Sequence, residues 1–109
     1  MERKDEVSGA TILAVSNRYE KLYYFNEDFE AIPKSIQEDI QVLLVMHTEE
    51  VGGILVLGFT EDGEMYFEAM AKEDDVYYDE IGSHLKIKKY QREKKELLEA
   101  LEEFYRCFF

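Results

Sequence analysis

The sequence is poor in several residues whose abundance marks a protein class. Its 109 residues include one cysteine, one proline and no tryptophan. Because Cys107 has no partner in the chain, an internal disulfide is excluded, as is usual for proteins of a reducing compartment. The longest apolar runs, VLLVM and ILVLGF, are far too short to cross a bilayer. The first residues, MERKDEV, lack the apolar stretch of a secretory signal, so we expect a cytoplasmic protein.

Positive charge is scarce as well. The chain carries 13 Lys and Arg against 25 Asp and Glu, which gives a net charge of −12. Nucleic-acid binding needs clustered cations, and an anionic membrane surface repels an acidic protein. We therefore expect neither nucleic acid nor membrane as a partner. One related role stays open, an acidic mimic of DNA, although the basic residues near the C-terminus argue against it.

The abundant residues indicate one globular domain. Hydrophobic residues make up 46% of the chain and aromatic residues 14%, which is enough for a core without disulfides or metal. The sequence shows no repeats, linkers or low-complexity tracts. We expect a single domain over residues 1–109, in which residues 1–8 are flexible because they are polar and terminal.

The first half of the chain predicts two strands and a helix. Residues 10–16 are apolar and β-branched, which favours a strand. A tight turn at Asn17 and Arg18 would join it to a second strand over residues 18–25, in a hairpin. A helix over residues 33–47 begins with the single proline and carries apolar residues at helical spacing. The alternative is that VLLVM, inside this segment, forms a strand.

The second half begins with a hairpin. Residues 54–59 and 65–71 are predicted as strands, joined by the turn Glu61-Asp62-Gly63, in which the glycine supplies a positive φ. Residues 54–59 are apolar on both faces, which is typical of a central strand.

The last third is less uniform. Residues 76–78 are a candidate edge strand, and residues 81–88 fit strand, helix or loop. Residues 90–108 carry a strong helical stripe of leucine and aromatic side chains. The sequence therefore predicts an α+β fold, with an antiparallel sheet of four to five strands, two main helices and the order ββ-α-ββ(β)-α.

Three blocks of the sequence resemble a known family. YYFNEDFEAIP, EEVGGILVLGF and DEIGSHLKIKKYQREKKELLEALEEFYRCFF are similar to recurring blocks of a family of short, acidic bacterial proteins of unknown function. The resemblance covers roughly residues 19–109. It implies a bacterial cytoplasmic protein and carries over no catalytic residue. The order of elements is also similar to that of profilin-like and longin-like domains, which implies nothing about function.

One candidate site is a metal or small-molecule site in the acidic segment 73–84. Carboxylates suit hard cations and histidine suits zinc or manganese. The sequence lacks the pattern of a calcium loop and the HExxH motif, and the alternative is a solvated loop that caps the next element. The candidate ligands are Asp75, Asp79, Glu80 and His84.

Two further candidates are binding surfaces. A basic segment follows the acidic one and is suited to an anion or an acidic partner, unless it only balances the charge of residues 1–85. The chain ends in a dense aromatic group that cannot all face inward on one helix, which favours a self-association surface. The basic candidates are Lys86, Lys88, Lys89 and Arg92, and the interface candidates are Phe104, Tyr105, Phe108 and Phe109.

Three other patterns have plainer interpretations. Cys107 paired with His47 or His84 would be a nucleophile, but a helix C-terminus disfavours a thiolate. Gly52 and Gly53 precede a strand, unlike a P-loop, and favour a turn. The tyrosine pairs 23–24 and 77–78 suit the core margin, or a small-molecule cleft.

We therefore expect a small binding protein. No motif for serine hydrolysis or zinc catalysis is present, so we expect neither a cofactor nor catalytic activity. The expected partners are a second copy of the chain, in a homodimer, and another protein. The alternative is a metal-dependent or small-molecule-dependent enzyme, or a ligand-binding protein, that uses segment 73–84.

Overall fold

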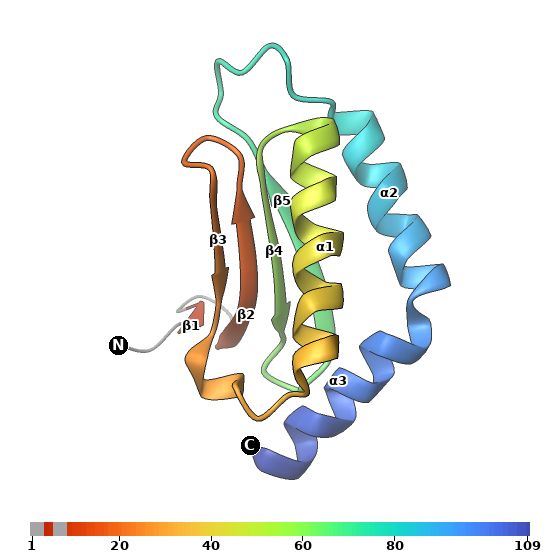
Figure 1. The fold of residues 1–109 in the computed structure, drawn as a ribbon. Coiled ribbons are helices and arrows are strands. Elements are labelled where there is room, and N and C mark those ends of the chain that lie inside the picture. Colours follow the sequence, from red (N-terminus) through yellow and green to blue (C-terminus); the bar gives the residue numbers. More distant parts are fainter. Residues whose placement is uncertain (1–3, 6–8) are drawn as a thin grey trace.

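The computed structural model describes residues 4–5 and 9–109, so the expected flexibility of residues 1–8 falls largely outside the described residues. Within this part, five strands, three α-helices and one 3-10 helix follow one another along the chain (Figure 1). They are β1 (Lys4–Asp5), β2 (Ala10–Asn17), β3 (Leu22–Phe25), η1 (Glu27–Phe29), α1 (Lys34–Val51), β4 (Ile54–Phe59), β5 (Met65–Met70), α2 (Glu80–Glu93) and α3 (Lys95–Phe108).

The strands form one antiparallel sheet. Its order is β1-β2-β4-β5, and β3 also pairs with β2. β1 pairs with the first residues of β2, and β3 pairs with the last four. β4 is therefore central, as its two apolar faces predict. The α+β class and the antiparallel sheet are confirmed.

The helix predicted over residues 33–47 is confirmed and extends to Val51. Pro33 stands at the N-cap with φ −51°, where its missing N–H costs no hydrogen bond. Ile40 and Leu44 lie on the buried face, as the helical spacing predicts. The alternative strand for VLLVM is wrong. Gly52 ends the helix, because its φ of +86° is a conformation that favours glycine and departs from helical geometry. Its N–H donates the last helical hydrogen bond, to the Thr48 carbonyl.

The first hairpin has a longer turn than predicted. β2 ends at Asn17, whose side-chain oxygen accepts hydrogen bonds from the N–H groups of Tyr19 and Glu20. Lys21 then adopts φ +54°. The second strand consequently begins at Leu22 rather than residue 18, and Tyr19 lies on the turn, where its side chain is free to reach a different element.

The second hairpin matches its prediction. Gly63 adopts φ +86° in the turn and donates its N–H to the Thr60 carbonyl. β5 follows as the edge strand of the sheet. The Met65 N–H, at the start of β5, donates to the Glu102 carboxylate of α3 at 2.8 Å.

The last third corrects the prediction in two places. Residues 76–77 form a turn and Tyr78 is irregular, so the predicted edge strand over residues 76–78 is wrong. Residues 81–88 lie in α2, which begins where the Asp79 carboxylate accepts the Gly82 N–H. The helix predicted over residues 90–108 is two helices, because the backbone of Lys94 (φ −106°, ψ 24°) leaves helical geometry.

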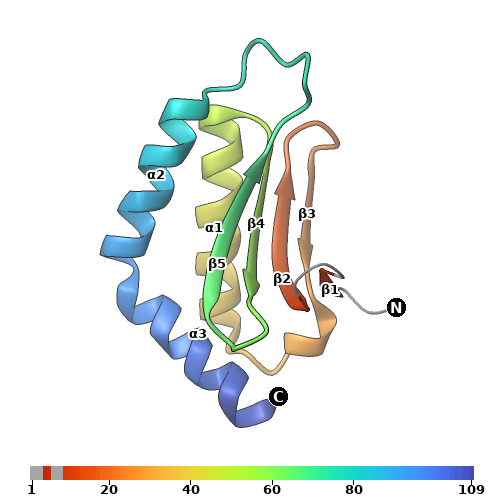
Figure 2. The ribbon, with the colours of Figure 1, turned by 180° about the vertical axis from the view of Figure 1, so that it is seen from behind.

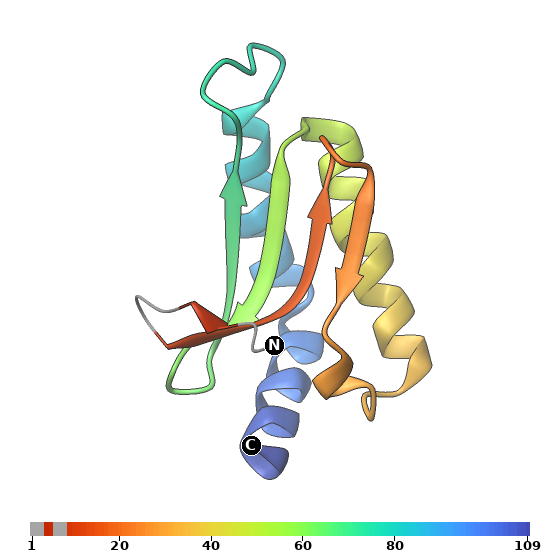
Figure 3. The same ribbon diagram turned by 90° about the vertical axis from the view of Figure 1, so that its left-hand side faces the viewer.

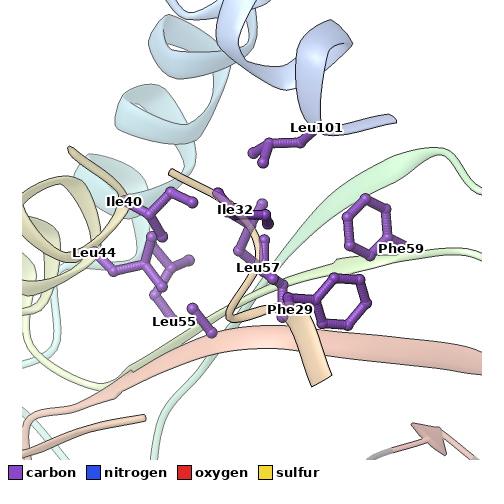
Figure 4. Close-up of a cluster of buried hydrophobic side chains, with 10 residues drawn as sticks. Phe29, Ile32, Ile40, Leu44, Leu55, Leu57, Phe59 and Leu101 are labelled. Carbon is purple, nitrogen blue, oxygen red and sulfur yellow. The ribbon is translucent and has the colours of Figure 1, made fainter. Parts of the chain in front are cut away.

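All three α-helices lie on one face of the sheet (Figures 2 and 3). Side chains from this inner face, from α1 and α3, and from η1 and the residues after it meet in one core (Figure 4). The Phe29 ring stacks on Phe59 at 5.4 Å between centroids and lies 4.6 Å from Phe109. The buried core residues are Leu13, Ala14, Phe29, Ile32, Ile40, Leu44, Leu55, Leu57, Phe59 and Leu101.

Phe29 joins the short 3-10 helix to the C-terminal helix, so its removal tests the packing of both. We expect Phe29→Ala to lower the free energy of unfolding by about 3–5 kcal/mol, because a large cavity replaces the ring. Urea unfolding measures the change. The control Val42→Ala, at an exposed position of α1, should stay within about 0.5 kcal/mol. A loss below about 1 kcal/mol in Phe29→Ala would contradict the aromatic packing.

Candidate functional site

The acidic loop between β5 and α2 is held in place by the first hairpin. The Tyr19 hydroxyl donates to the Asp75 carboxylate at 2.6 Å and accepts the Lys72 N–H at 3.0 Å. This hydrogen bond lowers the pKa of Asp75 and raises that of Tyr19. The Asp79 N–H donates to the Val51 carbonyl. The loop is therefore anchored at both ends to segments distant in sequence.

A cavity of about 580 Å³ lies between this loop, the end of β5 and the first turns of α2. Three of the four predicted metal ligands, Asp75, Glu80 and His84, line it. Glu80 and His84 are four residues apart on α2 and so share a helix face. Asp79 is not among the lining residues, since its carboxylate caps Gly82.

The predicted ligands do not converge on one point. Among the residues that the structure describes, no three His, Cys, Asp or Glu side chains come together as metal ligands. Asp75 accepts hydrogen bonds from Tyr19 and from the Tyr77 N–H. The arrangement therefore offers polar contacts along a cavity wall, rather than a closed coordination shell.

A buried polar link, which the sequence analysis missed, joins α1 to α2 beside this cavity. His47 of α1 is 1% exposed. Its Nε2 lies 2.9 Å from Ser83 Oγ and its Nδ1 lies 3.0 Å from Tyr90 Oη. In neutral imidazole one nitrogen donates and the other accepts, so the two hydroxyls satisfy both positions.

The link resembles a serine–histidine pair, but its burial opposes catalysis. Burial, with a smaller contribution from Lys86, lowers the pKa of His47 to about 4. The imidazole is therefore neutral at pH 7, as a general base must be. Ser83, however, is only 1% exposed, and a nucleophile must reach its substrate. The geometry supports a structural role in which the hydrogen bonds satisfy polar groups between two helices.

The basic segment lies along α2. Lys86 forms an ion pair with Glu50 of α1, which belongs to the helix packing. Lys88, Lys89 and Arg92 are exposed, and Arg92 contacts its neighbour Glu93 at 3.8 Å. In the described part of the chain, no ion pair joins the acids of residues 73–80 to this basic segment.

The C-terminal aromatic residues divide between core and surface. Phe104 and Tyr105 are partly buried and pack against the core. Phe108 and Phe109 are each more than 60% exposed, although Phe109 still contacts Phe29. Of the four predicted interface residues, Phe108 and Phe109 therefore expose the most apolar surface to a partner.

The other patterns have structural roles or lie apart. Gly53 accepts the Arg18 N–H with its carbonyl and adopts φ +75°, so the glycine pair forms a turn. Cys107 is exposed in the last turn of α3, with its thiol 3.8 Å from Glu103. His47, its proposed partner, is hydrogen-bonded to Ser83 and Tyr90 instead.

The outer face of the sheet is an apolar surface that the sequence analysis did not single out. Directly paired residues of an antiparallel sheet share a face, so the register gives its composition. No helix covers this side (Figure 3), and a shallow hollow of about 320 Å³ lies over β2 and β3. Its rows are Leu22, Asn17, Ile54 and Met70; Tyr24, Val15, Val56 and Glu68; and Ile12, Gly58 and Tyr66.

A sequence signal for this face existed. ILVLGF is apolar on both faces, and Leu22 and Tyr24 alternate with Tyr23 and Phe25. A central strand that is apolar on both faces is typical of a sheet covered on both sides. The helices of the described residues cover only one side of this sheet.

The depressed pKa of His47 predicts a pH-dependent stability. The unfolded histidine binds a proton below pH 6.5 and the folded one only near pH 4. Stability is therefore complete above pH 6.5 and falls as the pH drops toward 4, by up to about 3 kcal/mol. Urea unfolding at pH 7.5 and at pH 4.5 measures the loss in the free energy of unfolding. We expect His47→Gln to remove the part of this loss that comes from His47. His84→Gln, at an exposed histidine, is the control, and equal pH profiles for wild type and His47→Gln would contradict the buried link.

Comparison with known proteins identifies the family. The model of a family of unknown function, DUF6145, matches residues 10–109. No protein with a curated description and no solved structure matches the chain. No helix in the described residues is long and apolar enough to span a membrane. Because the match covers all of the sheet except β1, and all three α-helices, the chain belongs to this family of unknown function.

Proposed function

We propose that the protein is a non-catalytic interaction module that binds another protein through the outer face of its sheet and also self-associates. The observation that supports it is the unequal cover of the sheet. The inner face is filled by helices, whereas no helix lies over the outer face (Figure 3). There Leu22 and Met70 are exposed, Val56 is buried, and the other aliphatic and aromatic side chains are half-buried. Apolar surfaces of this kind mark sites of protein association.

The chemistry of the outer face favours a protein surface as its occupant. The face consists of four strands, about 4.8 Å apart and about six residues long, which gives roughly 400 Å² of flat area. A standard interface takes about 800 Å² from each partner. The sheet face therefore supplies an apolar centre, and polar surroundings must supply the rim.

A membrane is a poorer occupant for the same face. The chain carries a net charge of −12, and Glu68 lies within the face itself. An anionic bilayer repels such a surface. A protein partner can place a cation or a polar group against Glu68 and apolar side chains against the rest.

Site-specific photocrosslinking in the native host tests the proposal. A photoreactive residue at Met70, on the outer face, should give one discrete adduct with another protein. The second change Leu22→Lys, in the same cross-strand row, should reduce the adduct more than about tenfold, because a charge in the apolar centre costs more than 1.4 kcal/mol. Leu22 and Met70 are exposed, so these changes spare the core.

Met46, exposed on α1, provides the matched control. A photoreactive residue there should give no such adduct, and Met46→Lys should leave the Met70 adduct unchanged. An adduct that forms equally from Met46 and Met70, or that survives Leu22→Lys, would contradict the sheet face as the binding surface.

The cavity beside α2 supports a second candidate function, the binding of a small ligand with or without catalysis. Its volume of about 580 Å³ lies within the range of small-molecule sites. Glu80, His84 and Asp75 offer charged or polar groups along one wall. These residues belong to the segment that the sequence analysis singled out.

Thermal unfolding tests this second function. EDTA-treated protein is heated with divalent cations or phosphate-bearing metabolites, one at a time. A ligand at 100 times its dissociation constant adds roughly 2.7 kcal/mol to the stability of the folded state, so the midpoint should rise. The double variant Glu80→Gln/His84→Ala should remove the rise, whereas Lys34→Ala, at an exposed position far from the cavity, should keep it. A flat response across all compounds would leave the cavity without a ligand-binding role.

A further inference from the structure

Exposed apolar side chains gather on the loop before α2 and on the outward side of α2. Among the described residues, Tyr77 and Val76 are 92% and 84% exposed, and Ile81 and Leu85 are 75% and 61% exposed. Ile81 and Leu85 are four residues apart and so lie on one side of the helix. Ser83 and Tyr90, which bind His47, face the opposite side.

Among the described elements, none covers this side of α2, which lies at the outside of the helical layer (Figures 1 and 2). Lys88 and Arg92 follow Ile81 and Leu85 on the same side at helical spacing, with Lys89 beside them. Residues 73–80 carry five acids and no base. The surface therefore has an acidic end, an apolar middle and a basic end, and we call it the split-charge face. It consists of Asp74, Val76, Tyr77, Ile81, Leu85, Lys88, Lys89 and Arg92, with the exposed Glu73 and Glu80 at its border with the cavity.

From this order we infer that the split-charge face is a symmetric dimer interface, in which α2 packs antiparallel against α2 of a second copy of the chain. A two-fold axis makes each contact occur twice, so the surface must be complementary to itself. The acidic end of one α2 can face the basic end of the second α2 only when the two helices are antiparallel. The surface is then complementary to itself. The inference deepens the self-association in the proposed function and is independent of the sheet face.

The dimensions of α2 agree with this arrangement. With the axis beside Leu85, the two Leu85 side chains meet at the centre. Ile81 and Lys89 are each four residues from this centre, which is about 6 Å along the helix. Glu80 then lies near the partner's basic end, while the acidic loop reaches past it toward the partner's Arg92. Both ends gain opposite charges, and the apolar middle is buried.

Few of these charges are paired within the described residues, although Lys89 helps Lys86 to lower the pKa of Glu50. Within the part of the chain that the structure describes, acids 73–80 form no ion pair with another residue. Lys88 and Lys89 likewise form none, and Arg92 contacts only its sequence neighbour Glu93, at 3.8 Å. A second copy is also favoured over a differently charged protein, because both halves of the complementary pattern are present in one chain.

Sedimentation equilibrium of the whole chain tests the interface. The wild type should be a dimer whose dissociation constant rises with salt, because the charges are screened. Two charge-reversal variants, Lys88→Glu/Lys89→Glu and Asp74→Lys/Glu80→Lys, should each weaken the dimer more than about tenfold. Mixed one to one, they should restore a heterodimer, since each then meets an opposite charge. Leu85→Glu should also weaken the dimer, by placing two carboxylates together at the axis.

The control variants carry the same changes elsewhere. Lys21→Glu/Lys34→Glu reverses two exposed lysines away from α2, and Met46→Glu alters an exposed apolar position of α1. Both should leave the dissociation constant within about twofold of the wild type, and circular dichroism confirms that every variant is folded. A dimer that survives both charge reversals, or variants that fail to associate when mixed, would overturn the interface while leaving self-association in place. A wild type that stays monomeric at the highest soluble concentration would overturn both, without touching the sheet-face function.

Discussion

The structure depends on one constraint, which is that every helix packs on the same face of the sheet. Leu44 of α1 and Leu101 of α3 enter the same core as Leu55 and Leu57 of β4. A chain of 109 residues has enough apolar surface for this single two-layer core. The hydrophobic effect that holds the helices in place therefore leaves the second face of the sheet without cover. That face is the origin of the function we propose.

Buried hydrogen bonds fix the positions of the helices within the two layers, which the apolar contacts hold together. His47 fixes the position of α2 against α1 through Ser83 and Tyr90. Ser16 and Thr48, whose hydroxyls lie 2.8 Å apart, link β2 to α1 in the same way. Buried hydrogen bonds add little net stability, but an unmatched partner is costly. They therefore select one arrangement of the helices among those that the apolar contacts allow.

The sequence predicts those parts of the fold that local chemistry determines. The apolar run of β4, the turn at Gly63 and the spacing of α1 each act over a few residues, and each prediction is confirmed. The sequence did not identify residues 81–88 as helical, because Ile81 and Leu85 lie on the side of α2 opposite Ser83 and Tyr90. The apolar residues of α2 therefore do not follow one helical stripe. The exposed apolar positions that obscured the helix are the ones that suggest an interface.

The candidate site was less predictable, since its contacts join distant parts of the chain. His47 is 36 residues from Ser83 and 43 from Tyr90, and no spacing rule connects them. Tyr19 meets Asp75 across 56 residues, because the longer turn frees its side chain. In contrast, Glu80 and His84 share a helix turn, and their meeting at the cavity follows from their spacing once the segment is known to be helical.

The hydrogen bond from Met65 to Glu102 has a consequence for solubility. β5 is an edge strand, and an edge strand can pair with a strand of another molecule and so begin aggregation. The Glu102 carboxylate occupies one outward amide of this edge and adds a negative charge beside it. An incoming strand would have to displace that bond and approach the charge. In a protein that we propose to associate through faces, this bond therefore opposes strand addition at one end of the β5 edge.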